Sequence, residues 1–433
     1  MKLILPIEFY RKGGIERVIC GTVEEWIEID EVEEIILILQ KKDIPHFQEK
    51  LPKSPIIKYE SFILPPKSLQ SRILSLIDKF SSFSANVKAQ KVKIFFKRLR
   101  RKYQTEFSLK YLASRYQATH CLYFLANRLN PPNLDIPLAM ITHDMFWRFS
   151  PLTYPESYVN EYDLSLLEWL KKVNIVFTIS EKTRKDILSV FPEFSGKITP
   201  VPISGFPTKS NASPSQRLLG LAENSHESND ELPIFYLPSS FGVYKDHLTL
   251  LKAGIKLAQK NLKFKIVLIG KETDNLIAGN ISLSQQANSQ EYIDYLNQCQ
   301  EISQNNQNIM QEYFEGLGYC SDEDVEKWYR KCSCVVFPSK YEGFGLALSE
   351  AVVRGIPAIV SDLEVFEEQV ELYKCEDMVD FFPVGDVDAL ANCMEKFILH
   401  PKSKLSAEEV DKRFSHWTWR ETAKEYVRLL EQL

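Results

Sequence analysis

The stretch FPSKYEGFGLALSEAVVRGIPAIVSD, residues 337–362, holds the features that decide the fold. An apolar run, SCVVF, leads into two closely spaced glycines. The next residues, LALSEAVVRG, have helical spacing that closes at Gly355, two positions before Pro357. A second apolar run, PAIVSD, follows. This order predicts a buried strand, a glycine loop, a helix and another buried strand, which is the repeating unit of a doubly wound α/β domain.

The glycine loop predicts an anion site. Gly343 and Gly345 lie where the loop enters the helix, so backbone N–H groups there are unblocked by side chains and suit a phosphate or pyrophosphate. Glu342 and Glu350 flank this loop, about 12 Å apart along the axis if the segment were wholly helical. That exceeds the roughly 5 to 9.5 Å carboxylate spacing of glycosidases. Two carboxylates so placed suit hydroxyl groups at opposite ends of a nucleotide diphosphate sugar; alternatively, each is an ordinary helix acid.

The same alternation of strands and helices occurs twice along the 433 residues, which are too many for one ordinary core. Short apolar runs such as KLILPI, IILILQ and NIVFTIS come early, and PIFYLPS, FKIVLIG and MVDFFPV come late. Between them lies a polar stretch rich in Ser, Asn and Pro. We therefore expect two Rossmann-like doubly wound domains, 1–206 and 232–415, a linker over 207–231, and a final helix over 416–433 that crosses back to the first domain. A polar insertion over 271–311 is expected to be helical or mobile.

Composition excludes several classes of protein. A net charge of −5 and the lack of a helix-turn-helix, zinc-finger or RNA-binding signature argue against a nucleic acid partner. The eight cysteines are scattered, and Cys332 and Cys334, on one face of an expected strand, are predicted to be buried thiols and not metal ligands. No signal-peptide core and no 18-residue uncharged apolar run occur, so a cytoplasmic location is expected.

The motif E-G-F-G-L-x-L-x-E-A, followed by G-I-P-A-I-V-S-D, resembles the E-x7-E donor-site motif of retaining glycosyltransferases with the GT-B fold, glycosyltransferase family 4. The resemblance extends through residues 314–339 and 381–398. In the first domain it is thinner, but KGGIERVI, AMITHDMFW and VFTISEKTRKDI resemble family segments in the family's order. It implies two Rossmann-like domains facing a central cleft, with the acceptor on the first and the nucleotide sugar on the second. Some mannosyltransferase-like members are similar in having K-N-H where this chain has Lys245, Asp246 and His247.

The resemblance also implies roles for single residues. Catalytic roles fall to His143, Glu342 and Lys245, the last as the phosphate-binding lysine. Ser239 stands near where many relatives carry an arginine, so Lys245 is expected to be the main cation on the diphosphate. Asp144 either caps the next segment or orients His143. The donor-binding residues are expected to be Gly13, Gly14, Gly343, Phe344, Gly345, Leu346 and Glu350.

The implied reaction needs neither a metal nor a cofactor besides the donor, because the leaving phosphate helps to deprotonate the acceptor. The chain's sole D-x-D match, residues 386–388, opens an expected helix, so capping is favoured over a metal site.

The expected partners are a GDP- or UDP-sugar and a saccharide or lipid-linked acceptor, in the synthesis of cell-surface polysaccharide or glycoconjugate. The basic stretch KVKIFFKRLRRKY, residues 91–103, either lies on an anionic membrane surface at its cytoplasmic face or is a solvated helix. Two rival functions are a catalytically silent nucleotide-sugar-binding subunit and a sugar-nucleotide epimerase of similar fold. The joint presence of His143, Lys245, Glu342 and Glu350 argues against loss of catalysis.

Overall fold

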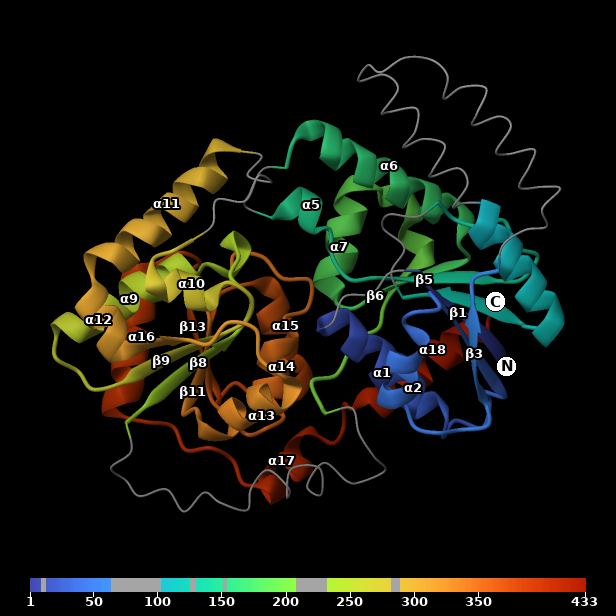
Figure 1. The fold of residues 1–433 in the computed structure, drawn as a ribbon. Helices are drawn as coiled ribbons and strands as arrows, with labels where there is room; N and C mark the ends of the chain where they lie inside the picture. The colour runs from blue at the N-terminus through green and yellow to red at the C-terminus, as the bar shows by residue number, and fades with distance from the viewer. Residues whose placement is uncertain (9–12, 64–102, 125–129, 151–153, 208–231, 282–288) are drawn as a thin grey trace, which may run out of the picture.

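The computed structural model describes residues 1–8, 13–63, 103–124, 130–150, 154–207, 232–281 and 289–433, which form two α/β lobes side by side (Figure 1). The first lobe contains β1 (Lys2–Ile7), α1 (Gly14–Trp26), β2 (Glu34–Leu39), α2 (Ile44–Lys50), β3 (Ile57–Ser61), β4 (His120–Tyr123), β5 (Leu138–Thr142), α5 (Phe146–Phe149), α6 (Glu156–Lys172), β6 (Ile175–Thr178), α7 (Glu181–Val190), the 3-10 helix η1 (Pro192–Lys197) and β7 (Ile198–Pro200).

The second lobe begins after residue 231. It contains β8 (Ile234–Pro238), the 3-10 helix η2 (Val243–Lys245), α9 (His247–Gln259), β9 (Lys265–Ile269), α10 (Thr273–Ala278), α11 (Gln290–Asn305), α12 (Gln307–Tyr313), β10 (Phe314–Gly316), α13 (Asp322–Lys331), β11 (Cys334–Phe337), α14 (Leu346–Val352), β12 (Ala358–Ser361), α15 (Glu364–Tyr373), β13 (Val379–Phe382), α16 (Val387–Leu399) and α17 (Ala407–Phe414). The last helix, α18 (Trp419–Leu430), lies on the first lobe.

Each lobe is built on a parallel sheet. The strand order is β3-β2-β1-β4-β5-β6-β7 in the first and β10-β9-β8-β11-β12-β13 in the second, and every pair of neighbours is parallel. The central strands are buried, as the near-continuous apolar runs predict. The doubly wound α/β fold expected from the sequence is therefore confirmed.

The strand order fixes where a ligand can bind. In both sheets the chain reverses its direction of growth between the first strand and the fourth, at β1/β4 and at β8/β11. Crevices at the carboxyl ends of strands open at such switch points. The glycine pair at 13–14 follows β1, while the loops at 239–242 and 338–345 follow β8 and β11. All three loops therefore meet at the boundary between the lobes.

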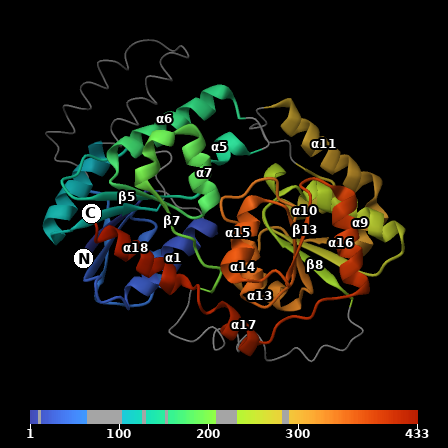
Figure 2. The same ribbon diagram turned by 180° about the vertical axis from the view of Figure 1, so that it is seen from behind.

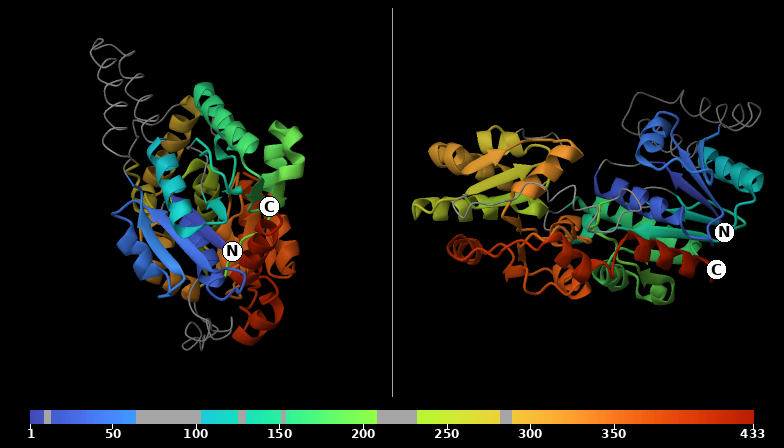
Figure 3. Two further views of the ribbon diagram at one scale, coloured as in Figure 1. Left: turned by 90° about the vertical axis from the view of Figure 1, so that its right-hand side faces the viewer. Right: turned by 90° about the horizontal axis from the view of Figure 1, so that it is seen from below.

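The C-terminal helix joins the lobes. Trp26 on α1 donates a hydrogen bond from Nε1 to the carbonyl of Ala423 on α18, at 3.0 Å. A Cβ at Gly21 would lie 2.4 Å from the Trp419 ring, so the absence of a side chain there allows α1 and α18 to pack closely. Figure 2 shows α18 beside α1, and Figure 3 shows both termini in the first lobe. We propose the same division into domains as above, 1–206, 232–415 and 416–433 around a 207–231 linker.

Some details differ from the sequence expectations. The strands β3, β7 and β10 were not predicted, because they are short and only partly buried. Cys332 is not in a strand: it caps the C-terminus of α13, and β11 begins at Cys334, although both thiols are buried. The insertion at 271–311 is largely helical in its described part.

The membrane expectation is not tested by the fold. The basic segment 91–103 lies outside the described residues except for Tyr103. No helix in the described part of the chain is long and apolar enough to cross a membrane.

Candidate functional site

A cavity of about 860 Å³ opens between the lobes at the two switch points. On one side its walls come from Gly13, Gly14 and α1 of the first lobe. On the other side they come from the loops that follow β8 and β11 in the second lobe. All twelve residues singled out from the sequence line it: Gly13, Gly14, His143, Asp144, Ser239, Lys245, Glu342, Gly343, Phe344, Gly345, Leu346 and Glu350. Residues up to 337 positions apart in the sequence therefore share one site.

One end of the cavity is organised by Glu342. Lys245 Nζ lies 2.5 Å from Glu342 Oε1, and Ser339 Oγ donates to the same oxygen at 2.8 Å. Burial alone would lower the pKa of Lys245, but the neighbouring Glu342 carboxylate outweighs it and the pKa is raised. Lys245 is therefore a cation held ready beside a carboxylate.

The glycine loop crosses to the first lobe. A Cβ at Gly343 would lie 2.1 Å from the carbonyl oxygen of His143, so no other residue fits this approach unless the backbone moves. The Gly343 carbonyl accepts hydrogen bonds from Ser180 Oγ at 2.6 Å and Thr183 Oγ1 at 3.1 Å. Gly345 has φ of 81°, a conformation natural to glycine, and is the N-cap of α14.

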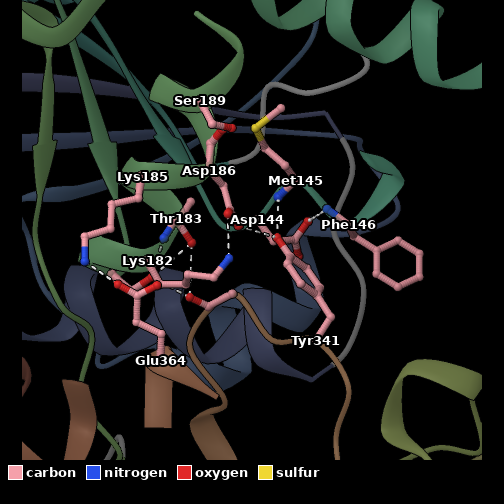
Figure 4. A network of polar contacts seen from close by, with 12 residues as sticks. Asp144, Met145, Phe146, Lys182, Thr183, Lys185, Asp186, Ser189, Tyr341 and Glu364 are labelled. Atoms are coloured by element: carbon pink, nitrogen blue, oxygen red, sulfur yellow. Dashed lines mark hydrogen bonds and ion pairs between the residues drawn. The ribbon is translucent and has the colours of Figure 1, made fainter. Parts of the chain in front are cut away.

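A polar network fixes this contact between the lobes (Figure 4). The Tyr341 hydroxyl donates to Asp186 Oδ2 at 3.1 Å and accepts from the Met145 N–H at 3.0 Å. Asp144 Oδ1 accepts from the N–H of Phe146, the first residue of α5, at 3.0 Å. Burial raises the pKa of both Asp144 and Asp186.

His143 follows β5 and is buried. Its Nε2 lies 2.6 Å from the carbonyl oxygen of Phe124, and because a carbonyl only accepts, Nε2 must carry the proton. Burial lowers the pKa of His143, so the ring is neutral at pH 7. The other nitrogen, Nδ1, is then a hydrogen-bond acceptor. A sugar hydroxyl is a suitable donor to it.

Glu350 organises the other end of the cavity. It is buried in α14, forms an ion pair with Arg17 of α1, and accepts at Oε2 from the Tyr329 hydroxyl at 2.9 Å. The Glu350 carboxylate raises the pKa of Arg17. Lys50 and Asp322 form a second, more exposed pair between the lobes, at 2.9 Å.

The chain is similar to known proteins both in sequence and in fold. Residues 221–413 match the family described as glycosyl transferases group 1. Those residues belong to that family. The O-antigen chain mannosyltransferase B of Escherichia coli is 43% identical over 54 residues, 12% of this chain and 14% of the relative. The serotype-specific mannosyltransferase WbdA of the same species is 23% identical over 238 residues, 53% of this chain and 26% of the relative. The chain thus spans about a quarter or less of the length of these two curated relatives.

Several solved structures share the whole fold. A sucrose-phosphate synthase of Thermosynechococcus elongatus has a TM-score of 0.63 at 15% identity, covering 100% of this chain and 99% of that one. HepE of Anabaena, solved with UDP and glucose, has a TM-score of 0.59 at 14% identity and full coverage of both chains. These likenesses identify the fold as GT-B.

Several site residues of this chain were not predicted from the sequence. Arg17 lies in the glycine-loop segment, four positions after Gly13, and its place one helical turn beyond a loop suited to phosphate is the signal that could have found it. The cavity walls contain two cations that the sequence analysis did not single out, Arg17 and Lys50, and the role of Lys245 as the main cation on the diphosphate stays a prediction. Nothing in the sequence pattern marked the side chains that hold the 338–345 loop, which are Ser180, Thr183, Asp186 and Tyr341.

A metal site is not visible in the described ranges, where no group of three or more His, Cys, Asp or Glu side chains is placed to hold an ion. Asp386 accepts a hydrogen bond from the Ala389 N–H at 2.9 Å and caps α16. The prediction that the D-x-D match is a helix cap is therefore confirmed.

Proposed function

We propose that this protein is a retaining glycosyltransferase that moves a hexosyl group from a nucleotide-diphosphate sugar to a saccharide or lipid-linked acceptor, in the synthesis of cell-surface polysaccharide or glycoconjugate. The observation that carries the proposal is the single cavity into which the two lobes bring His143, Lys245, Glu342 and Glu350. The mannosyltransferases among the relatives support a sugar-transfer reaction and make a mannose donor the first to test.

The donor would lie along the cavity. Glu350, with Arg17 and Tyr329 around it, would take the ribose, and the N–H groups at Gly14 and at 343–345 would take the diphosphate. Lys245 would move from Glu342 to the diphosphate, which leaves Glu342 to accept from the sugar hydroxyls. His143 Nδ1 would accept a further sugar hydroxyl. Each group meets a partner of matching chemistry.

The reaction would keep the anomeric configuration. As the bond between the sugar carbon and the phosphate oxygen breaks, positive charge develops on the sugar and negative charge on the leaving diphosphate. An acceptor hydroxyl then attacks from the same face, and its proton goes to the leaving phosphate oxygen. Lys245 and the loop N–H groups stabilise the diphosphate, and Glu342 stabilises the sugar. No separate base is needed.

Activity should therefore persist in EDTA, except for effects on product release. The measurement is the initial rate of nucleoside diphosphate release in EDTA, and then with added magnesium or manganese. Complete loss that either metal restores would contradict the metal-free step.

The decisive test is donor binding followed by product analysis. A panel of GDP-mannose, UDP-glucose, UDP-galactose and ADP-glucose should contain one compound that raises the melting temperature, since ligands that bind only the folded state stabilise it. Lys245→Ala should reduce that shift, while replacement of Lys256, an exposed α9 lysine paired with Asp388, by alanine should leave it unchanged. If no donor binds, the proposal fails.

Product analysis separates the rival functions. A transferase converts the bound donor to nucleoside diphosphate and a glycoside, with the donor's anomeric configuration kept. A silent subunit binds the donor and releases nothing. An epimerase changes the sugar of the donor without any acceptor.

A further inference from the structure

A run of aromatic side chains adjoins the Glu342 end of the cavity. It consists of Tyr244, Phe146, Tyr154, Tyr158 and Tyr162, named here the aromatic run, and all five side chains are partly exposed. None of the five is among the residues that line the cavity itself. Tyr244 lies in η2 of the second lobe. In the first lobe, Phe146 lies in α5, Tyr154 precedes α6, and Tyr158 and Tyr162 lie in α6. Figure 1 shows α5 and α6 above the boundary between the lobes.

The rings are in continuous contact. Phe146 meets Tyr244 edge to face across the boundary between the lobes, with ring centroids 4.7 Å apart, and meets Tyr154 at 5.4 Å. Tyr154 stacks on Tyr158 at 4.7 Å with an angle of 15° between the rings. Tyr158 and Tyr162, one turn apart on α6, follow at 4.4 Å. The run therefore forms one surface that leads away from the cavity.

Two links tie this surface to the reacting end. Tyr244 directly precedes Lys245, whose Nζ lies 5.1 Å from the centre of the Tyr244 ring. The Phe146 N–H donates to Asp144, which lines the cavity. The proposed nucleotide occupies the opposite end, at Glu350. An acceptor that reaches the donor sugar must therefore come from the Glu342 end, where the aromatic run begins.

Polar groups accompany the rings. The Tyr158 hydroxyl donates to the Tyr162 hydroxyl at 2.9 Å. Beside them, Asp163 accepts from Trp147 Nε1 at 2.8 Å and forms an ion pair with Arg148. Saccharides present a face of C–H groups and a rim of hydroxyls, which matches aromatic rings edged by phenols, a carboxylate and a guanidinium. An alkyl chain would instead remove these polar groups from water without replacing their hydrogen bonds.

We propose that the aromatic run is the acceptor subsite and that the acceptor is an oligosaccharide, several of whose units lie on these rings while its terminal unit reaches the donor sugar. The proposal rests on the proposed function for its direction along the cavity. Phe146 and Tyr154 are specificity-determining residues in this assignment, because they are the first rings that a sugar beyond the terminal unit meets.

The test measures oligosaccharide binding separately from nucleotide binding, on the full chain. The probes are mannotetraose and maltotetraose, followed by saturation-transfer NMR and titration calorimetry. At least one should bind, and Tyr154→Ala and Phe146→Leu should each weaken its binding about five- to tenfold, as expected for one lost ring contact. Tyr154→Phe, which keeps the ring, should bind within about twofold of wild type.

The controls separate stacking from damage to the fold. Leu164→Ala changes an α6 side chain that is 62% exposed and lies outside the aromatic run, and it should alter neither binding nor melting temperature. GDP and UDP affinities should be unchanged in Tyr154→Ala and Phe146→Leu. In a transfer assay these two variants should raise the KM for the oligosaccharide and leave donor hydrolysis unchanged.

The outcomes that overturn the proposal are distinct from those that overturn the enzyme. If neither oligosaccharide binds, or if both ring-removing variants bind as wild type does, the subsite is wrong even when a nucleotide sugar binds. Binding of dodecyl chains in preference to the oligosaccharides, lost in the same variants, would replace the saccharide by a lipid. If the oligosaccharide binds through the rings but no nucleotide sugar binds, the saccharide site is supported and the proposed transferase function is wrong.

Discussion

The two ends of the cavity hold the lobes together by different mixtures of contacts, although an exposed Lys185–Glu364 ion pair also crosses beside the Glu342 end. At the Glu342 end, short hydrogen bonds between mostly buried groups cross the boundary: Ser180 and Thr183 hold the Gly343 carbonyl, and Tyr341 joins Asp186. Glu368 of α15 also accepts from the Glu181 and Lys182 N–H groups, at 2.7 and 3.1 Å. At the Glu350 end, the Arg17–Glu350 and Lys50–Asp322 ion pairs cross the boundary, and the Gly205 backbone packs closely on that of Ser349 and Glu350.

This difference indicates which end of the cavity can exchange its contacts for those of a ligand. Buried hydrogen bonds are costly to break, because a buried donor or acceptor left without a partner lowers the stability of the protein by about 1 to 3 kcal/mol. The Arg17 side chain is 35% exposed and that of Asp322 is 78% exposed, so water and salt compete for those pairs. We expect the Glu342 end to act as a fixed contact and the Glu350 end to exchange its partners when a nucleotide enters.

The largest effect is expected at the Lys245–Glu342 pair. Lys245→Ala removes the buried cation nearest the sugar end and should lower kcat about a hundredfold, roughly 3 kcal/mol, by analogy with a lost electrostatic donor. Glu342→Gln should chiefly depress turnover as well, and the double variant should lose less than the sum, because the two side chains are 2.5 Å apart. Steady-state kinetics measure this. If the kcat of Lys245→Ala is within about threefold of the wild-type value, Arg17 or Lys50 is the main cation on the diphosphate instead.

Gly343→Ala breaks the fixed contact directly. The added Cβ would lie 2.1 Å from the His143 carbonyl oxygen, so one lobe must shift against the other. We expect a loss of about 1 to 3 kcal/mol in stability, as for other overpacked sites, and at least a tenfold loss of kcat. Gly196→Ala is the matched control, because nothing lies within 4 Å of its added Cβ. Equal melting temperatures for both variants would mean that the boundary at Gly343 is loose.

Arg17→Met tests the exchangeable end. In the described part of the chain, it leaves the Tyr329 hydroxyl as a side-chain partner of the Glu350 carboxylate, and since Arg17 is partly exposed, the loss of stability should be only about 1 kcal/mol. Glu350→Gln should weaken nucleotide binding more than turnover. Calorimetry with GDP and UDP at low and high salt measures both. Arg17→Lys keeps the charge and should show a smaller change than Arg17→Met; if the two variants agree, the charge of Arg17 has no role.

The sequence predicts the second lobe's part of the cavity better than the first lobe's part. Glu342, Gly343, Gly345 and Glu350 lie within nine consecutive residues, so spacing alone ties them to one loop and helix. Their partners cannot be found in that way, because Ser180, Asp186 and Arg17 come from the other lobe and meet the loop only when the two sheets face each other. A hydroxyl or a salt bridge that acts across 163 or 333 positions leaves no local periodicity.

The smallest predicted effect concerns His143 and its dependence on pH. Burial holds its pKa below the ordinary value of about 6.5, so below that pH the unfolded chain binds a proton that the native ring does not. Stability from this group is therefore present above about pH 6.5 and is lost as the pH falls, by at most about 1.4 kcal/mol per pH unit. Asp144 and Asp186, whose pKa values are raised, act in the opposite sense: their contribution is present at low pH and is lost as the pH rises through those values.

A comparison of His143→Gln with wild type cancels the contribution of the two acids, because both proteins contain them, and the Gln amide can still donate to the Phe124 carbonyl. Urea unfolding at pH 7, 6 and 5 should show wild type losing stability more steeply than the variant; equal slopes would mean that the native ring takes up its proton as readily as the unfolded one does, and that the fixed end of the cavity is wetter than its burial indicates.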